Sequence, residues 1–201
     1  MKYIFIRHGK TEYNEQRKYC GSTDTGLSEL GRAELETADV QAYLKEDTPD
    51  LVFCSPMLRA QETADLLFSD FPALPLLLSQ ELREIDFGKF EGKSYEELKD
   101  DPEYTAWLDT NCEGLIPDGD FPDRFREDVC LGFESIRETC ETEGVSAAAI
   151  VTHGGVIGAI LEKYAVPEKH WYEWHIPCGG YIVAEGDNVL NVTKLGGGST
   201  C

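Results

Sequence analysis

Short apolar runs recur along the chain, and three of them end directly at a polar or glycine-containing turn. Tyr3–Ile6, Leu51–Cys54 and Ala147–Val151 consist of apolar or aromatic residues and a single cysteine. Stretches with apolar residues at helical spacing separate these runs, as from Met57 to Phe68. Continuous apolar runs that alternate with helical patterns are typical of buried strands in a parallel sheet. The pattern predicts an α/β fold, a three-layer sandwich with a mostly parallel central sheet and helices on both faces.

The remaining elements follow from caps, prolines and turn residues. Ser28 is a suitable N-cap for a helix that runs to about Lys45, and Pro56 predicts a helix start after the second strand. A third short strand is expected at Leu76–Leu78. Gly180–Glu185 and Val189–Lys194 flank a Gly-Asp-Asn turn and predict a terminal hairpin, after which the glycines at 196–198 are expected to fray.

The stretch from about 90 to 145 differs from the rest of the chain. It is acidic, it contains prolines, and apolar residues from Phe121 to Cys140 recur at helical spacing without a strand signal. We interpret it as a helical lobe beside the sheet, within a single domain that spans 1–201. The aromatic residues Tyr104, Trp107 and Phe121 are expected to pack this lobe, with stacking on a flat substrate ring as the alternative.

Charge and composition narrow the choice of partners. The chain has 18 basic and 38 acidic side chains, a formal net charge of −20. Such a surface repels nucleic acid and anionic membranes, so neither is an expected partner, and any phosphate site must concentrate positive charge locally. The chain has seven scattered cysteines and no CxxC pair, which favours reduced thiols. No signal peptide is expected before Tyr3, and no apolar run is long enough to cross a membrane. Together these features favour a cytoplasmic protein. The oligomeric state is not readable from the sequence.

Polar residues with catalytic potential follow each of the three apolar runs. Arg7-His8-Gly9 follows the first, Ser55-Pro56-Met57-Leu58-Arg59 follows the second, and Thr152-His153-Gly154-Gly155 follows the third. Because ligands in α/β sheets bind beyond the carboxyl ends of the strands, two histidines and two arginines are expected in one crevice. This combination suits a tetrahedral anion.

Each of these residue types suits a step in phosphoryl chemistry. Arg7 and Arg59 offer planar forks of donors for phosphoryl oxygens, although Arg59 taken alone also fits an exposed helix charge paired with Glu62. A neutral His8 can attack phosphorus if a carbonyl, such as that of Gly9, fixes its tautomer. His153 opens a helix and can donate to a phosphoryl oxygen. A metal site is not expected, because no carboxylates or cysteines cluster nearby.

A phosphate ester also needs a proton for its leaving oxygen. The stretch Leu82–Gly92 offers three carboxyl groups, on Glu84, Asp86 and Glu91. One of them, placed near the departing alkoxide, serves as general acid and then as base for water. The spacing does not choose between the three.

The three motifs together resemble the histidine phosphatase superfamily, whose fold is that of the phosphoglycerate mutases. Arg7–Asn14 is similar to the signature of that family near the amino terminus, Ser55–Ala64 to its second motif and Val151–Gly155 to its third. The resemblance runs along nearly the whole chain in the same order. It implies a phosphohistidine at His8, Glu84 as the proton donor and no metal or other cofactor.

The resemblance also implies which residues hold the phosphoryl group. These substrate-binding residues are Arg7, Asn14, Arg59 and His153, with a backbone contact from the loop at Gly21. Glu84–Gly92 is similar to the small phosphatase branch, which includes α-ribazole-5′-phosphate phosphatases and broad-specificity phosphatases. Pro117–Phe121 and Gly26 depart from the family pattern, at positions that do not belong to the motifs of the phosphoryl pocket.

The expected function is therefore phosphomonoester hydrolysis of a small phosphorylated metabolite such as α-ribazole 5′-phosphate, which would place the enzyme in cobalamin biosynthesis. Three alternatives stay open: a mutase that returns the phosphoryl group to a second hydroxyl, a phosphatase of broad specificity, and a non-catalytic phosphate-binding protein.

Overall fold

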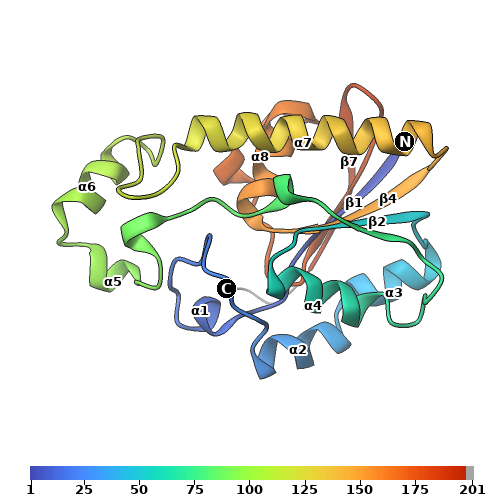
Figure 1. Cartoon of the computed structure of the whole chain (residues 1–201), viewed down its shortest axis with the longest axis horizontal. Coiled ribbons are helices and arrows are strands. Elements are labelled where there is room, and N and C mark those ends of the chain that lie inside the picture. Colours follow the sequence, from blue (N-terminus) through green and yellow to red (C-terminus); the bar gives the residue numbers. More distant parts are fainter. Residues whose placement is uncertain (198–201) are drawn as a thin grey trace.

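A twisted β-sheet forms the centre of the computed structural model, which describes residues 1–197 (Figure 1). Within this range the sheet has seven strands in the order β3-β2-β4-β1-β6-β7-β5. Only β6 runs against the direction of the others. The strands are β1 (Lys2–Arg7), β2 (Leu51–Cys54), β3 (Leu76–Leu78), β4 (Ala147–Thr152), β5 (Ala165–Val166), β6 (Tyr181–Glu185) and β7 (Leu190–Gly196). The mostly parallel sheet and the terminal hairpin β6–β7 confirm the sequence prediction.

Helices cover both faces of this sheet, as predicted (Figure 1). The α-helices are α1 (Glu12–Glu15), α2 (Glu29–Glu36), α3 (Asp39–Glu46), α4 (Leu58–Leu67), α5 (Tyr95–Leu98), α6 (Pro102–Asp109), α7 (Pro122–Thr142) and α8 (Gly154–Tyr164), and the 3₁₀ turns are η1 (Gln80–Leu82), η2 (Gly88–Phe90) and η3 (Trp171–Glu173). Because successive strand side chains point to opposite faces, Tyr3 and Phe5 of β1 join the core under α7 and α8. Ile4 and Ile6 join the core under α2, α3 and α4.

The single helix expected from Ser28 to Lys45 is in fact two helices. Ser28 caps α2 through a hydrogen bond that its hydroxyl accepts from the N–H of Gly31 at 3.0 Å, as predicted. Ala38 is extended, and α3 begins at Asp39. Leu35 and Val40 are both fully buried against the sheet, yet residues five apart do not share a face of one straight helix. The break lets both side chains reach the core.

The predicted lobe at 90–145 divides into two parts. The short helices α5 and α6 project beyond the sheet, whereas α7 lies along it (Figure 1). Phe133 of α7 packs on Tyr3, with ring centroids 5.1 Å apart. Tyr104 and Trp107 are buried, as expected, but Phe121 is 44% exposed and does not pack the lobe.

Most of the cysteines in the described residues are free thiols, as expected. Cys20, Cys54, Cys112, Cys130 and Cys140 are free thiols. Cys178 is disulfide-bonded, so the expectation of reduced cysteines is wrong for that residue. Of the glycines expected to fray, Gly196 belongs to β7, and Gly198 lies outside the described residues. None of the helices in residues 1–197 has the length and apolar character needed to span a bilayer.

Candidate active site

The three strand ends that carry the predicted motifs meet at one edge of the sheet. β2, β4 and β1 are neighbours and run parallel, so their carboxyl ends open on the same side. Arg7 is the last residue of β1 and His8 follows it, while His153 follows β4 and is the N-cap of α8. The rings of His8 and His153 lie 5.1 Å apart between centroids. The structure thus brings both histidines into the expected crevice.

His8 is held as a neutral imidazole with a defined tautomer. Its Nδ1 lies 2.7 Å from the carbonyl oxygen of Gly9, which can only accept, so Nδ1 carries the proton and Nε2 keeps its lone pair. The side chain is only 3% exposed. Burial, reinforced by the positive charges of Arg59 and Arg7, holds the pKa of His8 well below its usual value. The Gly9 contact expected from the sequence is therefore present, and Nε2 has the form that a nucleophile requires.

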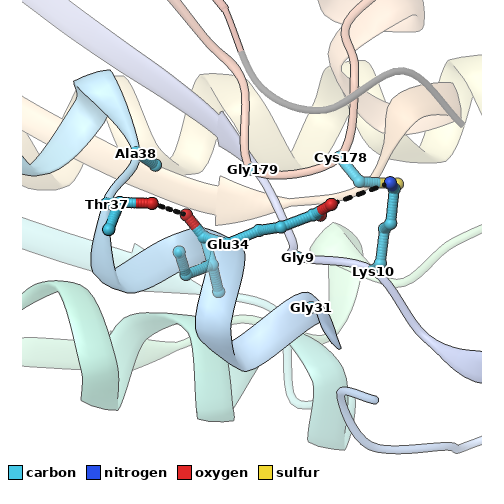
Figure 2. Close-up of a pocket in the computed structure, with 9 residues that line it drawn as sticks. Gly9, Lys10, Gly31, Glu34, Thr37, Ala38, Cys178 and Gly179 are labelled. Atoms are coloured by element: carbon cyan, nitrogen blue, oxygen red, sulfur yellow. Dashed lines mark hydrogen bonds and ion pairs between the residues drawn. The ribbon is translucent and has the colours of Figure 1, made fainter. Parts of the chain in front are cut away.

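The turn after His8 is held by α2, by α4 and by the chain before β6. The carbonyl of His8 accepts from Gly179 N–H at 2.9 Å, and Gly9 N–H donates to Thr63 Oγ1 at 3.0 Å. A Cβ on Gly9 would lie 2.6 Å from Leu35 Cδ1, so this position has no room for a side chain. Lys10 pairs with Glu34 of α2 (Figure 2), with Nζ 3.1 Å from Oε1. Both residues line a cavity of about 210 Å³. The backbone that carries His8 is thus well anchored.

Arg59 is fully buried and lies among backbone carbonyls and a histidine. Its Nη2 donates to Gly21 O at 2.7 Å, its Nη1 to Thr23 O at 2.9 Å and its Nε to His153 Nδ1 at 3.3 Å. The alternative of an exposed charge paired with Glu62 is wrong, since Arg59 is 0% exposed and Glu62 pairs with Arg32. Because a guanidinium has five N–H donors, Arg59 keeps capacity for an anion.

His153 is also neutral in this arrangement. Its Nδ1 accepts from Arg59, so its proton lies on Nε2, which contacts Ser55 Oγ at 2.8 Å. Burial and the charge of Arg59 are the main causes that hold its pKa well below the usual value. Donation from Nδ1 to a phosphoryl oxygen therefore requires a second proton, which the arrival of an anion favours.

Arg7 is the second arginine of the cluster. Arg7 donates through Nη1 to Ile176 O at 2.7 Å, whereas its buried Nε has no hydrogen-bond partner within residues 1–197. A Cβ on Gly154 would lie 3.5 Å from that Nε, so the glycine leaves open space beside the guanidinium. A buried, unpaired cationic N–H group beside His8 marks a place for an anion.

Glu84 is the carboxyl group that faces this place. Its Oε2 accepts from Gly155 N–H at 3.0 Å and its Oε1 from Ile85 N–H at 3.1 Å. Desolvation raises its pKa, against the opposing effect of these hydrogen bonds and of the two arginines. The other carboxyl groups that the sequence left open have different partners: Asp86 accepts from Gly88 N–H at 2.7 Å, and Glu91 binds the loop at Gly21.

Asn14 and Gly21, the other expected substrate contacts, have partners within the protein. Asn14 Oδ1 accepts from the N–H and the hydroxyl of Thr11, each at 3.0 Å, and so caps α1. Gly21 donates its N–H to Glu91 and gives its carbonyl to Arg59. The structure therefore places Gly21 behind Arg59, where it contacts the anion site through that side chain.

Comparisons with known proteins identify the family of this chain. The model of the histidine phosphatase superfamily (branch 1) matches residues 3–193. The chain belongs to this superfamily. Among its relatives, the adenosylcobalamin/alpha-ribazole phosphatase of Escherichia coli is 30% identical over 189 residues, which cover 89% of this chain and 87% of that protein.

Two further similarities agree with this assignment. The putative phosphoserine phosphatase 2 of Hydrogenobacter thermophilus is 29% identical over 164 residues, covering 80% of this chain and 77% of that protein. A crystal structure described as a putative alpha-ribazole-5′-P phosphatase from Escherichia coli superposes with a TM-score of 0.84 at 24% identity, covering 100% of this chain and 98% of that one, and so shares the fold. The chain is a phosphatase-type enzyme of the histidine phosphatase superfamily.

This histidine phosphatase has a substrate-sized cavity of about 590 Å³ that opens from Arg7 and Glu84. Sequence reasoning missed most of its wall, which comes from the segment after α8. The aromatic and histidine residues of this wall are Phe87, Trp171, Tyr172, Trp174 and His175. The sequence offered one signal for this wall. Trp171–His175 contains several aromatic residues in a stretch that lacks the periodicity of a strand or a long helix.

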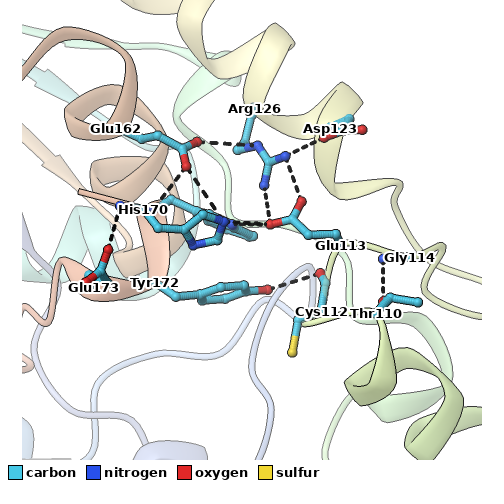
Figure 3. A network of polar contacts seen from close by, with 11 residues as sticks. Thr110, Cys112, Glu113, Gly114, Asp123, Arg126, Glu162, His170, Tyr172 and Glu173 are labelled. Atoms are coloured by element: carbon cyan, nitrogen blue, oxygen red, sulfur yellow. Dashed lines mark hydrogen bonds and ion pairs between the residues drawn. The ribbon is translucent and has the colours of Figure 1, made fainter. Parts of the chain in front are cut away.

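A polar network fixes this aromatic wall to the lobe (Figure 3). Glu113 Oε1 accepts from His170 Nε2 at 2.9 Å and from Trp171 Nε1 at 3.1 Å, and its Oε2 pairs with Arg126 Nη2 at 2.7 Å. Figure 3 shows His170 and Arg126 converging on Glu113, with Tyr172 reaching toward Cys112. The Arg126 guanidinium carbon also lies 5.2 Å from the Trp171 ring centroid. The network connects α7, the loop at Glu113 and the cavity wall.

The described residues contain no evident metal centre. No group of three or more His, Cys, Asp or Glu side chains within residues 1–197 is arranged to hold a metal ion.

Proposed function

We propose that this enzyme hydrolyses phosphate monoesters through a phosphohistidine at His8. The observation that carries the proposal is the hydrogen bond from His8 Nδ1 to Gly9 O, since it leaves Nε2 unprotonated beside Arg7 and Arg59. Nε2 attacks phosphorus, the bond from phosphorus to the ester oxygen breaks, and Glu84 gives its proton to that oxygen. Water then attacks phosphorus, the bond to Nε2 breaks, and Glu84 takes up the proton of the water.

The cations of the cluster stabilise the negative charge of the phosphoryl group. Arg7 offers its unpaired Nε, Arg59 its remaining N–H donor on Nη1 and His153, once protonated, its Nδ1. The amide N–H groups of Asn14 are available for the same anion, because its capping bonds use only the oxygen. Gly21 contributes by holding Arg59.

The substrate that we propose is a small metabolite whose alcohol carries a flat aromatic ring, such as α-ribazole 5′-phosphate. The cavity at Glu84 supports this choice, because Arg7 is the only lysine or arginine among its described lining residues and aromatic rings form much of its wall. A flat ring stacks favourably on such a surface. Mutase-type phosphoryl transfer to a carboxylated substrate receives less support, since a second anionic group would lack a cation there.

A panel of phosphate esters tests the proposal. The wild-type enzyme and H8A are incubated with α-ribazole 5′-phosphate, p-nitrophenyl phosphate and 2- and 3-phosphoglycerate, and both released phosphate and isomerised product are measured. We expect hydrolysis by the wild type, with the highest kcat/KM for the ribazole ester, and none by H8A. Full activity in H8A would overturn the phosphohistidine, and faster interconversion of the phosphoglycerates than hydrolysis would favour the mutase.

A further inference from the structure

A single carboxylate lies between two parts of the active site that come from distant segments of the chain. Glu91 Oε1 accepts from the N–H groups of Gly21 at 2.9 Å, Ser22 at 2.9 Å and Phe87 at 3.1 Å. Its Oε2 accepts from Thr23 Oγ1 at 2.7 Å. Four donors thus converge on one side chain, and three of them belong to the loop 21–23.

The loop 21–23 holds Arg59 from its other side. The carbonyls of Gly21 and Thr23 are the acceptors for Arg59 Nη2 and Nη1, at 2.7 and 2.9 Å. The N–H of Gly21 and the hydroxyl of Thr23 point to Glu91 instead. Glu91 therefore fixes the loop so that its carbonyls face the guanidinium, and in this way sets the orientation of Arg59.

The fourth donor belongs to the segment that carries the proton donor. Phe87 lines the substrate cavity and lies three residues after Glu84. The two segments are in close contact, because a Cβ on Gly21 would lie 1.9 Å from Ile85 O and 2.5 Å from Glu91 Oε1. The same carboxylate consequently ties the arginine-holding loop to the segment of the general acid.

We propose that Glu91 is a positioning residue that aligns Arg59 with Glu84 and Phe87 without touching the substrate. Active-site geometry is sensitive to displacements of about 1 Å, which can cost about a hundredfold in rate. The inference rests on the proposed function only in taking Arg59 as a ligand of the phosphoryl group. It also gives Glu91 a role other than that of the proton donor, which the spacing in the sequence left open.

The variants E91A and E91Q separate these roles. Glutamine keeps an oxygen that can accept from the three N–H groups, and the Thr23 hydroxyl can turn to accept from the new amide, whereas alanine removes every contact. We expect E91A to weaken the binding of inorganic phosphate and to lower kcat/KM by about ten- to a hundredfold. E91Q should recover most of both. The control is E97Q, because Glu97 accepts comparable bonds from Ser94 N–H at 2.9 Å and Ser94 Oγ at 3.0 Å, away from the site.

Calorimetric titration with inorganic phosphate gives a readout that does not depend on turnover. A folded E91A that binds phosphate and turns over substrate like the wild type would overturn the proposal and leave Glu91 a purely structural role. An E91Q as inactive as E91A, with a larger loss on esters of poor leaving groups, would make Glu91 the acid and would also overturn it. If E91A does not fold, T23V tests the same link, and its unchanged phosphate affinity would count against the proposal. A wild type that binds phosphate but hydrolyses nothing would refute the proposed function instead.

Discussion

Replacing Glu84 by glutamine tests the division of labour within the cluster. Glutamine has the same shape but no proton to give, and one of its two end atoms can no longer accept the N–H of Gly155 or Ile85. The loss of one such hydrogen bond costs about 1 kcal/mol of unfolding free energy, so E84Q should fold. General acid catalysis is worth about 10² to 10⁴ in rate, or about 3 to 5 kcal/mol.

The size of the effect should depend on the alcohol that leaves. An alkoxide from an alkyl ester needs the Glu84 proton, so E84Q should lose the full factor of about 10² to 10⁴ in the first step. The p-nitrophenolate ion leaves without a proton, so with p-nitrophenyl phosphate the first step should change little. The second step then becomes slow, because no base activates water, and the phosphohistidine at His8 should accumulate.

Stopped-flow and steady-state measurements check this reasoning. E84Q with p-nitrophenyl phosphate should release a burst of p-nitrophenolate equivalent to the enzyme concentration, followed by slow turnover. The matched variant is D86N, since Asp86 belongs to the same segment but binds Gly88 N–H. Equal losses in E84Q for alkyl and nitrophenyl esters, with no burst, would refute the assignment of Glu84 as the acid and base.

Three further predictions concern charge and protonation in the site. R59K should lower phosphate affinity and kcat/KM by about 10² or more, because an ammonium cannot reach Gly21 O, Thr23 O and His153 together, and calorimetry with phosphate measures the loss. His8 and His153 have lowered pKa values when folded, so the unfolded chain binds more protons below about pH 6.5 and the native state loses stability as the pH falls. The urea midpoint should therefore drop between about pH 7.5 and about pH 5.5, and by less in H153N; equal drops would contradict the cause. Phosphate binding should be coupled to the uptake of one proton, at His153 Nδ1. Calorimetry in buffers of different ionisation enthalpy measures this uptake, which E84Q should retain. If no proton is taken up, His153 stays neutral in the complex and the prediction is wrong.

The cluster could be predicted because its residues follow buried strands. β1, β2 and β4 are continuous apolar runs, and the rule that parallel strands present their carboxyl ends together needs no knowledge of the helices. The same rule predicted a crevice for His8, Arg59 and His153 before any distance was known. The break between α2 and α3 was missed because it serves contacts with the sheet that residue periodicity within the helix does not report.

The substrate cavity and the role of Glu91 depend on a different kind of information. The aromatic wall at Trp171–His175 reaches Arg7 because Glu113, from the lobe, accepts hydrogen bonds from His170 and Trp171. Glu91 becomes a partner of Arg59 only through the loop 21–23, about 70 residues earlier. In a chain with 38 acidic side chains, sequence alone cannot tell these two carboxylates from solvated ones. The structure distinguishes Glu91 and Glu113 from solvated carboxylates, because each accepts hydrogen bonds from three or more donors in distant segments. These bonds fix the loops around the catalytic cluster, whereas the strands fix the cluster itself.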